Sequence, residues 1–221
     1  MDPLTRRWRA VCEIAAPDAA SREVDAVGAD LLSRWHESHR HYHDTTHLTE
    51  VLTAVDTLCA GGRLRDRSAR TLALLAGWFH DAIYDPTPDA ANEQESADLA
   101  REELGRLGVG GAVVDRVCTV VLDTVNHDVV AGGGGVGEER LVFHDADLWV
   151  LGAPVARFDE YCEQVRAEFA QVATGDYAVA RTAVLRTFLV RPHVYLTAHA
   201  RREWESRAKE NLAREVTRLA G

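Results

Sequence analysis

The chain has 221 residues, of which 46% are hydrophobic and 27% are charged, and its formal net charge is −10 at pH 7. This length and composition are ordinary for a globular protein with one sizeable core. Because an acidic surface repels the nucleic-acid backbone, we do not expect a polynucleotide partner. A small anionic substrate is still compatible with a bound cation that supplies positive charge.

Apolar residues recur at intervals of three and four along the first half of the chain, which is the spacing of amphipathic helices. This pattern predicts helices at about residues 4–15, 24–35, 48–61 and 68–81, and Gly61 and Gly62 are expected to end the third. A fifth helix follows, with Asn92 expected as its N-cap and Glu95 at the capping-box position.

The second half of the chain continues the helical pattern. We predict helices at about residues 113–125, 141–151, 154–169, 177–190 and 200–219, and a flexible loop at Gly132 to Gly135. The first of these segments is rich in valine, which also favours strands, but no sustained alternating pattern occurs. The sequence therefore predicts an all-α protein, a single-domain helical bundle over residues 1–221, in which helices at about 154–221 pack on the rest.

Two apolar segments carry His and Asp side chains that an ordinary core does not need. In WFHDAIYD, His80 and Asp81 end an apolar helix, and in FHDADLWVLG, Asp145 and Asp147 lie among apolar residues. A buried carboxylate is unfavourable unless it is paired or binds a metal. A lone histidine or aspartate in such a place is more often a hydrogen-bonded core residue or a helix cap, but recurrence in separate helices favours metal ligation.

A third stretch adds imidazole groups. His43 and His47 are four residues apart at a predicted helix start, so they can share one face. Imidazoles and carboxylates without thiolates argue against a closed structural zinc site. They suit one divalent metal ion as cofactor, with Mn, Fe, Co, Ni, Zn or Mg as the candidates.

The ordered set His47, His80, Asp81 and Asp147 resembles the HD-domain superfamily of metal-dependent phosphohydrolases. The segments RHYHDTTHL, WFHDAIYDP, NEQESA, TVNH, DADLWVLGAP, YCEQVRAEF and EWESRAKENLARE are similar to one bacterial branch, usually described as a predicted HD-superfamily phosphohydrolase. The likeness extends from about residue 40 to the C-terminus. It implies an HD-type helical bundle with its metal-site core at about 40–150 and these four residues as the metal ligands.

The fourth ligand has two candidates in the sequence, because Asp145 and Asp147 are both available. Residues two apart on a helix point in different directions, so both cannot face one ion. The superfamily ligand commonly follows an alanine, and Asp147 fits that context better. Asp145 is interpreted as an outer-shell partner or a surface charge.

The resemblance implies a phosphoric ester hydrolase in which metal-activated water attacks a phosphate ester of a small molecule, with a nucleotide as one candidate. Such a reaction needs a nearby acid or base, and we single out Asp85, Glu93 and His127 as catalytic candidates. Some nucleotide-cleaving members carry a glutamate where this chain has Tyr84, so Glu93 is a candidate for the missing carboxylate. Asp85 is equally well explained as a turn residue before a proline, and His127 as a helix-end residue.

Two other functions are compatible with the sequence. A non-catalytic, metal-stabilised binding module would not bring Asp85, Glu93 and His127 towards the metal. A di-iron oxygenase of the HD type would need extra ligands, for which His43 and His127 are available. With no signal-peptide pattern and no membrane-length apolar run, we expect a cytoplasmic protein without a membrane partner. The oligomeric state is left open, a homodimer included.

Overall fold

The computed structural model describes residues 2–61, 67–87, 90–129 and 136–221. Within these ranges the chain is helical and has no strand, which confirms the predicted all-α class. The helices are α1 (Pro3–Ala15), α2 (Ser21–Trp35), α3 (Thr45–Gly61), α4 (Arg67–Phe79), α5 (Asn92–Arg106), α6 (Gly111–Leu122), α7 (Glu138–Asp147), α8 (Val155–Glu168), α9 (Thr174–Leu189), α10 (Ala198–Glu203) and α11 (Glu205–Leu219), with short 3-10 helices η1 (Asp123–Val125) and η2 (Leu148–Gly152). None of these helices is long and apolar enough to cross a membrane.

The valine-rich segment is helical, as predicted, because α6 buries its valines against the neighbouring helices α5 and α4. The predicted C-terminal helix is instead divided into α10 and α11 at Trp204, whose ring packs on Tyr195 with the ring centroids 5.5 Å apart. The predicted glycine loop at 132–135 lies outside the described residues.

Asn92 is not the N-cap that the sequence predicts. It is the first residue of α5, and the N-cap position belongs to Ala91, which makes no side-chain cap. The Asn92 amide instead binds both backbone groups of Asp85: Nδ2 donates to the carbonyl and Oδ1 accepts the N–H, each at 2.9 Å. These two hydrogen bonds close the connection between α4 and α5. The Asn92 side chain therefore binds the backbone of that loop and does not cap α5.

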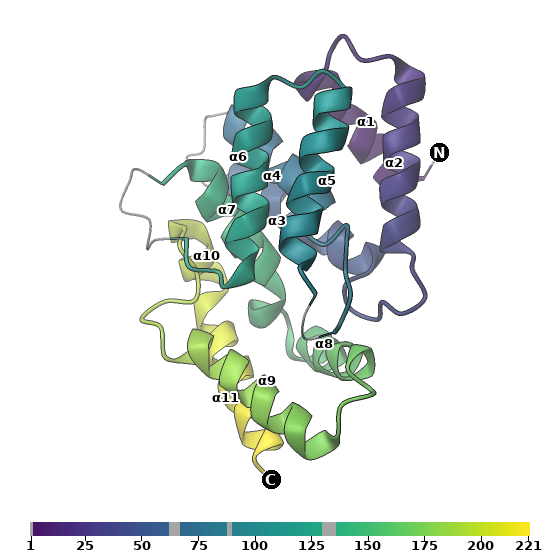
Figure 1. Ribbon diagram of the computed structural model, residues 1–221. Helices are drawn as coiled ribbons and strands as arrows, with labels where there is room; N and C mark the ends of the chain where they lie inside the picture. Colours follow the sequence, from purple (N-terminus) through teal and green to yellow (C-terminus); the bar gives the residue numbers. More distant parts are fainter. Residues whose placement is uncertain (1, 62–66, 88–89, 130–135) are drawn as a thin grey trace.

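The helices form a central group and a C-terminal group. In the central group α3, α4 and α7 pack against one another, α5 pairs with α6, and α1 pairs with α2. Figure 1 shows α8, α9 and α11 gathered at the other end of the molecule, near the C-terminus. The two groups meet at η2, which contacts α3 and α7 of the central group and α8 and α11 of the C-terminal group. The largest fully buried side chains include Trp8, Trp35, Trp78, Tyr195, Phe79, Phe143 and Phe158.

Gly28 allows α2 to approach α1. A Cβ at this position would lie 2.3 Å from Trp8 Cδ1, and the Trp8 ring is held by a hydrogen bond from Nε1 to the Val24 carbonyl (2.7 Å). We expect Gly28→Ala to lower the free energy of unfolding by roughly 1–3 kcal/mol, because the ring cannot move without losing that bond. The measurement is urea unfolding.

The matched control is Gly105→Ala in α5, where a new Cβ meets nothing within 4 Å. Alanine favours a helix over glycine, so this variant should be neutral or more stable by up to about 1 kcal/mol. Equal loss of stability in both variants would contradict the close approach at Gly28.

Candidate metal centre

Three helices place the four predicted metal ligands. His47 lies in the first turn of α3, where Asp44 Oδ1 accepts the His47 backbone N–H (3.3 Å) and fixes the helix start. His80 and Asp81 directly follow the end of α4, which is buried along most of its length. Asp147 is the last residue of α7. The ends of apolar helices thus deliver these polar side chains to the interior.

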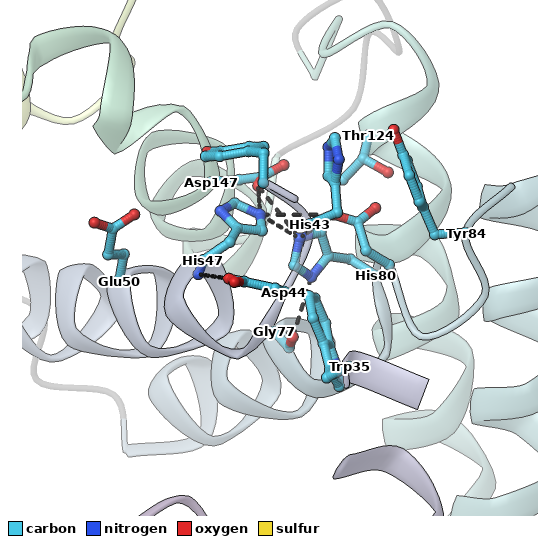
Figure 2. A network of polar contacts seen from close by, with 12 residues as sticks. Trp35, His43, Asp44, His47, Glu50, Gly77, His80, Tyr84, Thr124 and Asp147 are labelled. Carbon is cyan, nitrogen blue, oxygen red and sulfur yellow. Dashed lines mark hydrogen bonds and ion pairs between the residues drawn. The ribbon is translucent and has the colours of Figure 1, made fainter. Parts of the chain in front are cut away.

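The ligand atoms converge on one point (Figure 2). His47 Nε2 lies 3.1 Å from His80 Nε2, and Asp147 Oδ1 lies 3.3 Å from both nitrogens. Asp81 Oδ2 lies 3.0 Å from His80 Nε2 and 3.6 Å from His47 Nε2. His47, His80 and Asp147 offer atoms that all lie within 4.8 Å of one another, so this group could hold a metal ion.

These spacings match a coordination shell. Ligand atoms ~2.1 Å from one ion, in tetrahedral or octahedral arrangement, lie roughly 3.0–3.4 Å apart. The tautomer of His80 also suits a ligand, because its Nδ1 hydrogen-bonds to the Gly77 carbonyl at 3.0 Å as the donor. When the ring is neutral, its Nε2 lone pair then points into the cluster, where an ion would bind. The donor set and its geometry therefore fit a divalent cation.

Opposite charges hold the cluster together. Burial alone would lower the pKa of His47 and His80, but the carboxylates of Asp81 and Asp147 outweigh it and raise both pKa values. Burial alone would raise the pKa of Asp81 and Asp147, but the two imidazoles lower both well below the ordinary range. The carboxylates of Asp81 and Asp147 therefore stay ionised in the cluster, and they favour a positive charge beside them.

A cavity of about 580 Å³ opens beside the cluster. His47, Asp81 and Asp147 line it, whereas His80 is fully buried behind them, with a side chain 1% exposed. The cavity volume is typical of small-molecule sites. A ligand could therefore approach the cluster from this cavity.

Two of the three predicted catalytic residues line this cavity. Glu93 reaches it from the first turn of α5. His127 follows η1, and its Nε2 lies 3.8 Å from Asp147 Oδ2. Burial lowers the pKa of His127 to about 4, so its imidazole is neutral near pH 7. Its φ of 52° is left-handed, and Arg191 donates to its carbonyl at 2.9 Å.

Asp85 is not among the residues that line the cavity. Its Oδ1 accepts the Thr87 backbone N–H (2.9 Å), and its own backbone is held by Asn92. These contacts correspond to the turn role that the sequence also allowed.

Asp145 is fully buried, so the interpretation as a surface charge is wrong. Its two oxygens accept the backbone N–H groups of Leu196 and Thr197, each at 2.7 Å, and Oδ1 also meets His144 Nδ1 at 3.0 Å. Asp145 thus fastens the segment before α10 to α7, and Asp147 is the aspartate that meets His47 and His80.

Glu168 is a site residue that the sequence analysis missed. Its Oε1 accepts the backbone N–H groups of His41, Tyr42 and His43 at 2.9, 2.8 and 2.9 Å. Its Oε2 accepts His43 Nδ1 at 2.8 Å and the Tyr84 hydroxyl at 2.9 Å. Although burial alone would raise the pKa of Glu168, these donors lower it to about 2. A signal was present, since Glu168 continues the buried face of α8.

His43 is placed by this carboxylate at the cavity wall. Its ring stacks on Tyr84 with centroids 4.2 Å apart and meets the His47 ring at 5.8 Å. Because Nδ1 is bound to Glu168, Nε2 is the atom that is left for a ligand. His43 and His127 do not join the metal-binding group found among the described residues.

No protein-family model, no curated protein and no solved structure matches this chain. The all-helical fold and the His47–His80–Asp147 group therefore define the protein only as an all-α protein with a candidate metal centre. The resemblance to the HD superfamily rests on the sequence motifs.

Proposed function

We propose that this protein is a metal-dependent phosphohydrolase of the HD type that acts on a small phosphate ester. The observation that carries the proposal is the convergence of the two imidazole Nε2 atoms, 3.1 Å apart, with one oxygen each of Asp81 and Asp147 that lies 3.0–3.6 Å from both nitrogens, at the wall of an open cavity. We take Asp81 as the fourth ligand, because its Oδ2 meets both histidines.

A divalent ion held by these four residues supplies a Lewis acid and lowers the pKa of a coordinated water. His80, which lies behind the cavity wall, would hold such an ion from the buried side, and a substrate would reach it from the cavity. There the side chains of His43, Glu93 and His127 are available to exchange protons or to contact phosphoryl oxygens. His43 is the best-oriented of the three, because Glu168 fixes its ring through Nδ1.

The test is a metal-dependent activity screen. The purified protein is stripped with a chelator, reloaded with Mn, Fe, Co, Ni, Zn or Mg in turn, and assayed for phosphate release from phosphomonoesters, phosphodiesters and nucleotides. We expect turnover with at least one ion, its loss on chelation and its return on reloading. Two irons per chain with no hydrolysis would instead support the oxygenase alternative, and tight metal binding without any turnover would support a binding module.

A further inference from the structure

Arg181 occupies a core-facing position of α9. The helix buries Tyr177, Leu185 and Phe188, and Arg181 stands four residues from each of the first two, so all four share one face. A guanidinium at such a position loses hydration that a partner must replace. The identity of that partner therefore decides what Arg181 does.

No carboxylate of the described ranges neutralises Arg181. Among the described residues its hydrogen-bond partner is the Tyr161 hydroxyl, with the guanidinium 5.0 Å from that ring, and no carboxylate forms an ion pair with it. Arg157 shows the contrast, because it binds both oxygens of Glu50, at 2.6 and 2.9 Å. A guanidinium has five N–H donors, so most of those of Arg181 are left for a ligand.

The second arginine at the cavity has a different role. Arg191 donates to the backbone carbonyls of His127 and Asn126 at 2.9 and 3.2 Å, so it holds the turn that carries His127. Arg191 thus has a structural role, whereas Arg181 donates to one side-chain oxygen in the described part of the chain.

Arg181 and the metal centre share one cavity. A continuous aromatic wall joins them: the Arg181 guanidinium lies on Tyr161, the Tyr161 ring meets Tyr42 at 4.6 Å, and Tyr42 meets His47 at 4.7 Å. Apolar side chains of α9 and η2 also line this cavity. A single small molecule can therefore contact the metal ligands and Arg181 together.

We propose that Arg181 binds a second anionic group of the substrate. The substrate class is then a molecule with a phosphate ester at the metal end, a less polar middle, and a further phosphate or carboxylate at the Arg181 end. This inference rests on the proposed phosphohydrolase function. The planar guanidinium fork matches both kinds of anion, so the experiment has to separate them.

The experiment uses phosphonates, which mimic phosphate esters but cannot be hydrolysed. Alkyl phosphonates, bisphosphonates with one phosphonate at each chain end, and alkyl phosphonates with a terminal carboxylate are titrated calorimetrically into the metal-loaded protein at several matched chain lengths. At the best length we expect one of the doubly anionic series to bind roughly tenfold to hundredfold more tightly than the monophosphonate. The doubly anionic series whose affinity exceeds that of the monophosphonates by more shows whether the second anion is a phosphate or a carboxylate.

The variants are Arg181→Gln, Arg181→Lys and the control Arg186→Gln, which changes an exposed arginine of α9 outside the cavity. Arg181→Gln should remove the advantage of the second anion, Arg181→Lys should keep part of it, and Arg186→Gln should keep it all. Circular dichroism and thermal unfolding check each fold, and Arg181→Lys serves as the test if Arg181→Gln does not fold.

The two proposals fail differently. If the metal-loaded wild type binds no phosphonate, the phosphohydrolase function fails and this inference falls with it. If monophosphonates bind only in the presence of metal but a second anion brings no gain, or the gain survives in both Arg181 variants, only the role of Arg181 is overturned.

Discussion

Asp147→Ala is expected to lower the affinity for the divalent ion at least about hundredfold and to abolish phosphate release. Asp147 Oδ1 lies 3.3 Å from the Nε2 atoms of both His47 and His80, so its removal opens the cluster on the side of α7. Loss of an outer-shell partner alone costs about ten- to hundredfold in affinity, and loss of a direct ligand costs more. Competition with a chromophoric chelator measures the affinity, and elemental analysis counts the ions retained after gel filtration.

The control for this variant is Asp128→Ala. Asp128 is an exposed carboxylate at the same cavity, and it makes no ion pair with the histidines in the described parts of the chain. The control should retain its metal, which separates ligation from the general effect of one negative charge. Undiminished metal binding and turnover in Asp147→Ala would contradict the proposed metal centre.

The helices and the meeting of His47, His80 and Asp147 in one cluster could be predicted because their signals are local. Three- and four-residue spacing marks a helix wherever it occurs, and tertiary packing here agrees with it even in the valine-rich α6. His80, Asp81 and Asp147 were identifiable because each ends an apolar helix, where an unpaired polar group would be unfavourable.

Glu168 and Arg181 could not be assigned a role from the sequence, because their roles depend on distant partners. Glu168 binds the backbone at His41, 127 residues away in sequence, and only the packing of α8 against the loop before α3 brings them together. The sequence does show a charged residue at a core-facing position in each case, on α8 and on α9. Such a position indicates that a partner exists, but not which one.

Glu168→Ala is expected to lower the free energy of unfolding by roughly 3 kcal/mol or more. The substitution leaves three backbone N–H groups, at His41, Tyr42 and His43, without their common acceptor. The Tyr42 hydrogen bond is buried and the other two are part-buried, and an unpaired buried donor is unfavourable by about 1–3 kcal/mol. It also releases the Tyr84 hydroxyl. Urea unfolding measures the loss. Glu163→Gln, an exposed change on the same helix, is the control and should be neutral.

Glu168→Gln isolates the charge, because it keeps one oxygen for the backbone donors. The pKa of Glu168 is lowered from 4.5 to about 2 in the folded protein, so the ionised carboxylate stabilises the fold above pH 4.5. This contribution, roughly 3 kcal/mol, is lost as the pH falls from 4.5 towards 2. The difference in unfolding free energy between wild type and Glu168→Gln should therefore be largest near neutral pH and shrink in acid. A difference that is constant with pH would contradict the carboxylate role.

The same variant tests whether Glu168 positions His43 for the reaction. A glutamine places an NH2 group opposite His43 Nδ1, which must then become the acceptor and move the ring proton to Nε2. If His43 accepts a proton through Nε2, kcat should fall at least about tenfold and the pH profile should shift, while metal affinity stays near that of the wild type. If Glu168 only supports the fold, kcat should follow the fraction of folded protein and the pH profile should not move.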